Sequence, residues 1–172
     1  MLYEEVVDQH KDFSGWQAAH ATGIGGSEIA AVLGESRWKS RLRVWGEKTN
    51  NLEHPDLGGI EAVEWGLLLE PVIAKKFQQM TDVPVEMAGV LLRSIAHPWA
   101  IVTPDYWTMD DKGVWNIPVQ IKATSAYMLK DWLNGAPWEV QLQEQMEMFV
   151  TGAPYAYVAQ GHARRGHTEA HC

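Results

Sequence analysis

Short apolar runs bounded by polar turns predict the strands of this chain. The runs that combine β-branched and aromatic residues are 83–93, 99–103, 114–123 and 155–160, and the first is interrupted near Ala88-Gly89. Helical spacing of apolar residues, with Ser or Gly at the ends, predicts helices over 28–33, 40–48, about 65–77, 125–133 and 138–150. In the second of these, Leu42 and Trp45 are expected to face inward. Together the elements predict an α/β (α+β) fold with a central mixed β-sheet flanked by helices.

Length and composition set the outer bounds. A chain of 172 residues is expected to form one domain, 1–172, with 1–15 as a lead-in and 161–172 as an irregular or truncated tail. The lone cysteine is Cys172, the N-terminus has no apolar leader, and no apolar run is long enough to span a bilayer. These features predict a cytoplasmic protein with no membrane partner.

The residues leading to Lys122 carry the first candidate chemistry. An apolar run closes at Asp105, a Gly-containing turn follows, and a second strand carries Gln120 and Lys122. Two residues apart on a strand, Gln120 and Lys122 share one face, while Val119 and Ile121 point into a core. An acid closing one strand beside a polar pair on its neighbour frames a small metal site. A solvated hairpin with an exposed Gln and Lys is the alternative.

Two stretches near the N-terminus suit phosphate binding. The Gly-rich turn 22–27 ends at Ser27, which is expected to cap a helix whose free N–H groups attract phosphate; a simple capped helix is the alternative. The following loop carries Arg37, Trp38 and Lys39, which could line a DNA track or a solvated face. The net charge of −8 argues against a general nucleic-acid binder, although 5 of the 14 Lys and Arg residues fall within 37–48.

These motifs resemble a known family. Pro104-Asp105 followed by Ile121-Lys122 resembles the PD-(D/E)XK nuclease signature, and residues from about 16 to 159 resemble the YqaJ-like viral recombinases, phage exonucleases related to bacteriophage lambda exonuclease. The stretch that starts at Gly23, GIGGSEIA, resembles the family's GIGGSDIA element. Further matching elements are Ser36-x-Trp38-Lys39-Ser40 with Lys48-Thr49, Gly66-x-x-x-Glu70-Pro71, and the run from Gln143 to Gly152.

The resemblance implies a restriction-endonuclease-like core and a metal-dependent 5′-to-3′ exonuclease of a recombination system. Asp105 would anchor Mg²⁺, or Mn²⁺, with the side chain of Gln120 and the carbonyl of Ile121 as further oxygen ligands. Glu70 would hold a metal-bound water or a second ion. Lys122 would orient the attacking water, and Gln143 would fix Lys122 or a water by hydrogen bonding.

The resemblance also implies how DNA is held. Ser27 and its turn would face the 5′ phosphate, with His20 where the family usually carries Arg, and Arg37, Trp38, Lys39 and Lys48 would line the path. The implied partners are duplex DNA ends, a single-strand annealing protein and further copies of the chain in a ring-shaped trimer. The implied source is a phage or a prophage.

One position departs from the family pattern. Gln120 stands where the family has Glu or Asp, and an amide brings no negative charge to a cation. A deliberate replacement, a natural variant with reduced activity, and compensation by another acid such as Glu70 are all open at this point. The alternatives to an active nuclease are a non-catalytic DNA-end binder and a protein-interaction module on the same fold.

Overall fold

The computed structural model describes residues 2–52, 59–162 and 168–171. Part of the loop expected between the second and third helices, residues 53–58, lies outside this range, as does Cys172. The described chain opens with β1 (Tyr3–Asp8) and α1 (Phe13–His20), so residues 3–15 form a strand and the start of a helix where a lead-in or a short helix was expected. β1 pairs antiparallel with β4, and this backbone pairing organises an acidic segment that has little apolar signal of its own.

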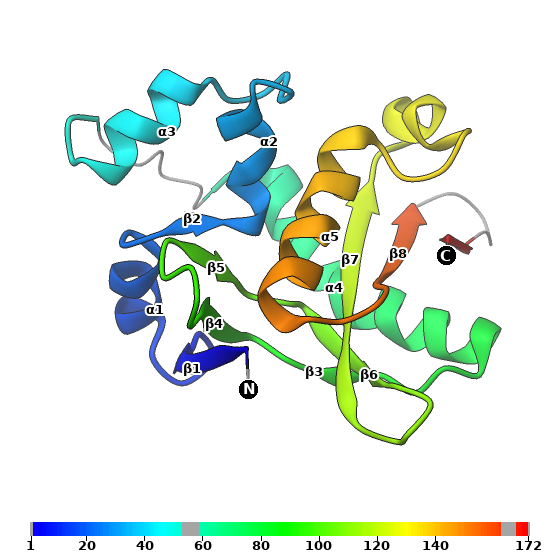
Figure 1. The fold of residues 1–172 in the computed structure, drawn as a ribbon. Coiled ribbons are helices and arrows are strands. Elements are labelled where there is room, and N and C mark those ends of the chain that lie inside the picture. Colours follow the sequence, from blue (N-terminus) through cyan, green and yellow to red (C-terminus); the bar gives the residue numbers. More distant parts are fainter. Residues whose placement is uncertain (1, 53–58, 163–167, 172) are drawn as a thin grey trace.

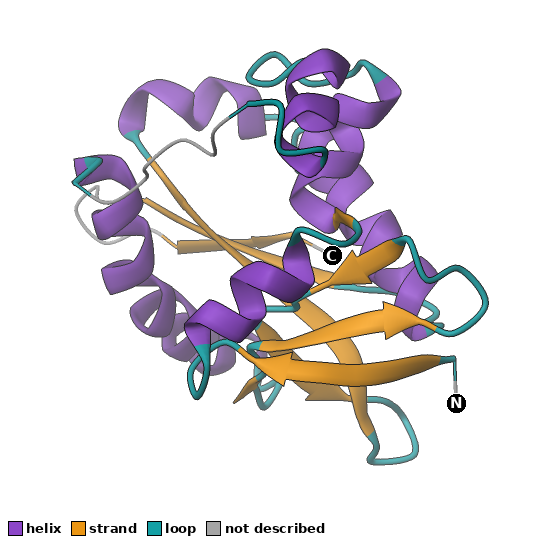
Figure 2. Cartoon of the chain, turned by 90° about the vertical axis from the view of Figure 1, so that its left-hand side faces the viewer, coloured by secondary structure: helices purple, strands orange, loops and turns teal. Residues whose placement is uncertain are grey.

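Two mixed sheets form the centre of the molecule, and helices pack around them (Figures 1 and 2). The four-stranded sheet has the order β1-β4-β5-β2, with β2 (Ile24–Gly25), β4 (Val90–Ser94) and β5 (Ala100–Val102). The five-stranded sheet has the order β3-β6-β7-β8-β9. Its strands are β3 (Glu86–Met87), β6 (Tyr106–Met109), β7 (Trp115–Thr124), β8 (Tyr157–His162) and β9 (Thr168–His171). The predicted α+β class is confirmed, with two sheets in place of one.

The hairpin is built from different strands than predicted. β7 pairs antiparallel with β6, with Tyr106 opposite Val119, whereas residues 100–102 form β5 in the other sheet. β6 is a run of only four residues directly after Pro104-Asp105, which is too short to stand out beside the longer apolar run before it. Asp105 therefore begins the strand next to β7 and does not close it. The expected adjacency of Asp105 and Gln120 survives.

The helices match the predicted spacing, with differences at their starts. They are η1 (Gly26–Glu28), α2 (Ile29–Leu33), α3 (Arg41–Lys48), α4 (Glu61–Thr81), η2 (Ala126–Trp132) and α5 (Trp138–Thr151). Ser40 caps α3 as predicted, because its hydroxyl accepts from Arg43 N at 3.2 Å. Ser27 does not act as a cap. The carboxylate of Glu28 accepts from Gly25 N at 2.9 Å and closes the turn instead.

The inward face of α3 was predicted wrongly. Leu42 and Trp45 are 69% and 57% exposed, while Val44 and Glu47 are buried. Glu47 is stabilised inside by ion pairs with two basic residues, a feature that apolar spacing does not reveal. In α4, Ile73 and Phe77 are buried as their spacing predicts, whereas Trp65, Leu68 and Val72 are exposed. Pro71 lies within α4 without ending it.

Each long helix covers a core. α4 packs on β7, β8 and β9 over the apolar cluster of Ile73, Phe77, Val119 and Ile121. α5 packs on β4, β5 and β7, with Met146 and Val150 in a second cluster. β7 is thus covered by α4 on one face and approached by α5 on the other, which fixes where its polar residues point (Figure 1).

The end of the described chain is ordered as strand. β8 runs to His162 and pairs with β9, where an irregular tail was predicted. β8 pairs with β7 as far as His162, and this backbone pairing holds the end of β8 as a strand although the local sequence is rich in Gly, His and Arg. None of the helices in the described ranges combines the length and apolarity of a transmembrane span.

Candidate active site

Strand β7 presents the predicted polar pair to α5. Val119 and Ile121 pack in the core under α4, so the pleat turns Gln120 and Lys122 to the opposite face. There Lys122 Nζ donates to Gln143 Oε1 of α5 at 2.9 Å. The contact predicted between Lys122 and Gln143 is therefore present, and it joins the strand to the helix.

Asp105 is anchored to the same strand. Its Oδ2 accepts from Ile121 N at 2.8 Å and from the side-chain amide of Gln120. Gln120 Oε1 in turn accepts from Gln143 Nε2. Lys122, Gln143, Gln120 and Asp105 thus form one continuous chain of hydrogen bonds across β6, β7 and α5. The structure brings all four predicted residues together.

The amide nitrogen of Gln120 occupies the middle of this arrangement. It donates to Asp105 Oδ2 and lies 3.5 Å from the carbonyl oxygen of Ile121. These two oxygens are the predicted ligands of the cation, so the neutral NH₂ group stands between them. For Gln120 to offer oxygen to a cation, its amide would have to turn over and give up the hydrogen bond to Asp105.

Glu70 of α4 is the fifth predicted residue, and it lies near enough to Asp105 and Lys122 for their charges to affect its pKa. Partial burial, with the negative charge of Asp105 nearby, raises the pKa of Glu70 to about 7, and Lys122 opposes the rise. Burial also raises the pKa of Asp105, again against the effect of Lys122. These shifts show a group of acids withdrawn from water and short of positive charge, which is typical of functional sites.

Two buried acids of α5 belong to this group and were missed in the sequence. Glu144 and Glu147 are both buried, and burial raises both pKa values, with Glu147 adding to the rise for Glu144 and Asp105 to that for Glu147. Glu147 Oε1 accepts from Gln143 Nε2 at 3.3 Å. The signal was available, because position 147 lies on the same helix face as Gln143, Met146 and Val150, where an acid is out of place.

The donor set fits a hard divalent cation. Asp105, Glu70 and the Ile121 carbonyl offer oxygen, the ligand that Mg²⁺ and Mn²⁺ prefer, and Gln120 can offer oxygen once its amide turns over. Both oxygens of Glu144 and Oε2 of Glu147 are buried without a hydrogen-bond partner among the described residues. In the same part of the chain no three acids, His or Cys stand close enough to form a ready ion cage. Lys122 offsets only part of the cost of burying these acids, because burial still raises the pKa of Asp105, Glu144 and Glu147, and a cation near them would stabilise their charged forms.

Four predicted DNA-binding residues gather at the Gly-rich turn. Lys48 Nζ lies 2.8 Å from Glu28 Oε2 and donates to the carbonyl of His20 at 2.8 Å. Lys39 Nζ pairs with Glu47 at 2.5 Å and reaches Glu28 at 3.5 Å. Ser27 is exposed on the turn. The two lysines are thus already partnered by buried acids, which reduces the positive charge they present.

The turn lies against the candidate site. A Cβ added at Gly26 would stand 3.3 Å from Gln143 Cγ, so the backbone of the turn touches the helix residue that holds Lys122. A Cβ at Gly25 would stand 2.5 Å from His20 Nε2, so a larger residue there would displace the imidazole of His20 from the turn. The predicted phosphate turn and the predicted catalytic residues are therefore neighbours.

Arg37 and Trp38 have different contacts from the lysines at the Gly-rich turn. The guanidinium of Arg37 pairs with Asp131 at 2.8 Å and with Glu139 at 3.5 Å, which ties the loop to η2 and α5. It also lies 5.2 Å from the centre of the Trp38 ring. Trp38 is 74% exposed and free to stack on a base. The structure keeps this pair on the surface, apart from the cluster around Glu28.

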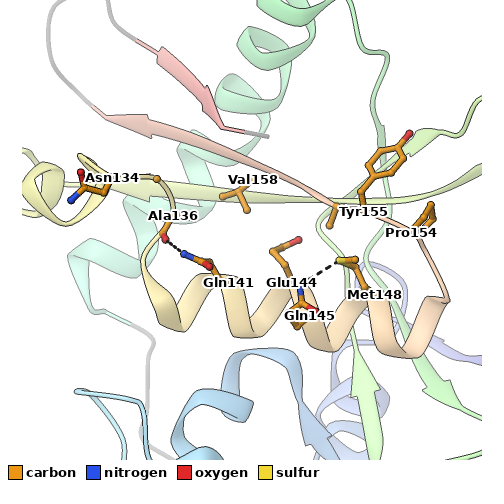
Figure 3. Close-up of a pocket in the computed structure, with 11 residues that line it drawn as sticks. Asn134, Ala136, Gln141, Glu144, Gln145, Met148, Pro154, Tyr155 and Val158 are labelled. Carbon is orange, nitrogen blue, oxygen red and sulfur yellow. Dashed lines mark hydrogen bonds between the residues drawn. The ribbon is translucent and has the colours of Figure 1, made fainter.

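A pocket of about 620 Å³ lies beside α5 (Figure 3). Its lining includes Glu144, Gln145, Met148, Tyr155 and Val158. None of the predicted catalytic residues lines it. Figure 3 shows Glu144 rising from α5 on the side where Val158 of β8 lies.

Comparison with known sequences decides the family. The pattern of the YqaJ-like viral recombinase domain matches residues 15–154, most of the chain. This chain belongs to the YqaJ-like viral recombinase family. It is 29% identical over 160 residues to the uncharacterized protein YqaJ of Bacillus subtilis (strain 168), covering 90% of this chain and 49% of that protein. The chain thus spans about half the length of the curated relative it matches.

Solved structures share the fold of this YqaJ-like recombinase domain. The alkaline exonuclease LHK-Exo from Laribacter hongkongensis superposes with a TM-score of 0.72 at 19% identity, over 91% of this chain and 79% of that one. LHK-Exo in complex with dAMP superposes with a TM-score of 0.67 at 19% identity, over 84% and 72%. At this identity the likeness establishes the fold, and the restriction-endonuclease-like core expected from the sequence is confirmed.

Proposed function

We propose that this chain is a metal-dependent deoxyribonuclease that degrades duplex DNA from the 5′ end, with Mg²⁺ or Mn²⁺ as its cofactor. The observation that carries the proposal is the chain of hydrogen bonds that joins Asp105, Gln120, Gln143 and Lys122. Glu70 lies near enough for the charges of Asp105 and Lys122 to affect its pKa. Family membership and the fold shared with an alkaline exonuclease support it.

The residues supply distinct parts of phosphodiester hydrolysis. A bound divalent cation would polarise the phosphate and lower the pKa of the attacking water. Asp105, Gln120 and the Ile121 carbonyl would hold it, and Glu70 would hold a water at its edge. Lys122, fixed by Gln143 at 2.9 Å, brings a positive charge to the oxygens on which negative charge develops.

End recognition would fall to the Gly-rich turn. The backbone N–H groups near Ser27 and the adjacent His20 and Lys48 suit a terminal phosphate. Because Gly26 touches Gln143, a phosphate on this turn would lie one packing contact from the cutting site. Arg37, Trp38 and Lys39 would hold the strand farther out.

A cleavage assay tests this function. Linear duplex DNA with 5′ phosphates is incubated with Mg²⁺, with Mn²⁺ or with EDTA, and closed circular duplex serves as the control. We expect nucleotides to be released from the 5′-ended strand of linear DNA only, and only with metal. DNA binding without release under every metal condition, by both the parent and Gln120→Glu, would contradict a nuclease.

A second candidate is a non-catalytic binder of DNA ends. It is favoured by the hydrogen bonds of the site, because Gln120 satisfies Asp105 and Gln143, and Gln143 in turn accepts from Lys122, without any cation. A salt titration of DNA binding separates this candidate from an interaction module that does not bind DNA, since phosphate contacts weaken steeply with salt.

Partners and location are proposed on family grounds. Duplex DNA ends are the substrate, a single-strand annealing protein receives the exposed strand, and further copies of the chain form a trimeric ring. Exposed apolar side chains of α4, among them Trp65, Leu68 and Val72, provide surface for such contacts. The setting would be the cytoplasm of a bacterium that carries the phage or prophage. Sedimentation of the purified chain, alone and with duplex DNA, measures the oligomeric state.

A further inference from the structure

The face of α5 that packs on the sheets carries a carboxyl group which packing does not explain. Gln143, Met146, Glu147 and Val150 are three or four residues apart and share this face. Met146 and Val150 lie in the apolar cluster over β4 and β5. Glu147 is buried beside them with 1% of its surface exposed. Burial penalises the charged form of this carboxyl group more than Lys122 offsets, so its presence calls for a further cationic partner.

Glu147 and Gln120 flank one hydrogen-bond donor. Gln143 Nε2 donates to Gln120 Oε1 and also lies 3.3 Å from Glu147 Oε1. Glu147 Oε2 is buried and has no hydrogen-bond partner in the ranges that the structure describes. The amide group of Gln143 thus has Gln120 of β7 as one neighbour and the carboxyl group of Glu147 of α5 as another. Position 120 is where the family has its acid.

The charge of the site points the same way. With Gln120 neutral, Asp105 is the acid that the β6–β7 pair brings to the predicted cation position. Glu147 lies near enough to Asp105 and Lys122 for their charges to affect its pKa, and it would supply a second negative charge when a cation binds. A divalent cation bound by one carboxylate and neutral oxygens is held weakly, and a second carboxylate corrects this.

We propose that Glu147 is a ligand, through Oε2, of the divalent cation at this site, and that it supplies from α5 the negative charge that Gln120 does not bring from β7. The inference rests on the proposed function, since it concerns the metal of the same nuclease site. It makes this chain a member in which the second acid has moved from the strand to the helix.

Glu144 provides a matched control. It lies on the same helix, is buried, and has both oxygens without a hydrogen-bond partner among the described residues. It has no hydrogen bond to Gln143 in that part of the chain, and it lines the pocket beside β8 instead. Glu144→Gln therefore removes a neighbouring negative charge without removing the proposed ligand.

The test is Mn²⁺ binding without DNA, followed by the electron paramagnetic resonance signal of free Mn²⁺. The proteins are the parent, Glu147→Gln, Glu144→Gln, Gln120→Glu and the double variant Gln120→Glu/Glu147→Gln. We expect Glu147→Gln to weaken Mn²⁺ binding at least tenfold, and Glu144→Gln to change it less than threefold. In the Gln120→Glu background the loss from Glu147→Gln should fall below threefold, because the strand acid then takes over.

Folding is controlled separately. Glu147→Gln keeps the size of the side chain, and Glu147→Met is an apolar replacement of similar volume that removes the charge without a new polar group. Without metal, the midpoint temperature of thermal unfolding of both variants should be at least as high as that of the parent. Both variants should lose Mn²⁺ affinity to the same extent.

Equal Mn²⁺ affinity in the parent and Glu147→Gln would overturn the inference, as would an equal loss in Glu144→Gln. Cleavage that requires Asp105 but not Glu147 would overturn it and leave the proposed function standing. Mn²⁺ binding that depends on Glu147, without cleavage even in Gln120→Glu, would support the ligand role and contradict the nuclease. No Mn²⁺ binding by any of the proteins would overturn both.

Discussion

The side-chain amide of Gln120 donates a hydrogen bond to Asp105 across the β6–β7 pair, and its nitrogen stands between Asp105 and the carbonyl of Ile121. A carboxylate at position 120 would place a second negative charge against Asp105 in a buried setting. Without metal, Gln120 therefore stabilises the buried Asp105 by a hydrogen bond, which predicts a measurable effect on stability.

Gln120→Glu should lower the metal-free stability of the protein. The replacement removes the donor to Asp105 and adds a like charge, so we expect a loss of about 1–3 kcal/mol. Mg²⁺ or Mn²⁺ should restore more stability to Gln120→Glu than to the parent, because ligand binding stabilises the state that binds it. Thermal unfolding with and without metal measures both effects. Equal metal-free stability of the two proteins would contradict the close contact between residue 120 and Asp105.

Lys122→Met should separate metal binding from catalysis. The ammonium lies beside Asp105 and is held by Gln143, so its removal takes away a repulsive charge from the cation and a stabilising charge from the reacting phosphate. We expect cleavage to fall by about 10² or more while Mn²⁺ affinity stays equal or rises. Single-turnover cleavage and Mn²⁺ titration check the two parts. A parallel loss of metal affinity would instead assign Lys122 a structural role.

Lys39 and Arg37 should behave differently, although the sequence places both in one basic cluster. Lys39→Ala leaves the buried Glu47 with one ion-pair partner fewer, and we expect the free energy of unfolding to fall by about 1–3 kcal/mol. Arg37→Ala should leave thermal unfolding nearly unchanged and weaken DNA binding, with a smaller salt slope. Urea unfolding and salt-dependent DNA titration test the pair. Unchanged DNA affinity at low salt in Arg37→Ala would remove this loop from the DNA path.

Glu144 should make the metal-free protein less stable as pH rises. Burial raises its pKa in the native state, and Glu147 adds to the rise, so the native protein keeps a proton that the unfolded chain releases above about pH 4.5. The stability contributed by this proton is complete at low pH and is lost as pH increases through neutrality. Lys122, which opposes the shift, and Asp105, which reinforces it, are present in both proteins compared.

The comparison is between the parent and Glu144→Gln. The variant should gain stability relative to the parent as pH rises from about 5 to 8, and the two should converge near pH 4. Thermal unfolding across this range in EDTA gives the difference. A constant gap between the two curves would mean that Glu144 is ionised throughout.

The sequence predicts the site better than it predicts the sheets that hold it. The sequence identifies four residues that the structure joins by hydrogen bonds: Asp105, Gln120, Lys122 and Gln143. Strand pleating puts Gln120 and Lys122 on one face, and the family motifs point to the other two. The four-residue strand β6 and the edge strand β1 are missed because their stability comes from pairing with β7 and β4. Apolar periodicity alone cannot signal a strand that the neighbouring backbone organises.

Buried acids explain the remaining differences. Apolar spacing assigned Leu42 and Trp45 to the interior of α3, whereas Glu47 occupies it through ion pairs with Lys39 and Arg43. Glu147 is likewise a buried acid, on the face of α5 that carries Met146 and Val150. A charged residue on a helix face that reads as apolar is therefore informative, because only a partner or a function keeps it there.

Cleavage by the parent, Gln120→Glu and Gln120→Glu/Asp105→Asn tests the central claim most directly. Linear duplex DNA is used with Mg²⁺, with Mn²⁺ and with EDTA, after thermal unfolding has shown that the three proteins fold. We expect Gln120→Glu to cleave up to about 10²-fold faster than the parent, and we expect both Asp105→Asn and EDTA to abolish this activity. A well-folded Gln120→Glu that cleaves no faster than the parent, or activity that survives Asp105→Asn, would contradict the claim.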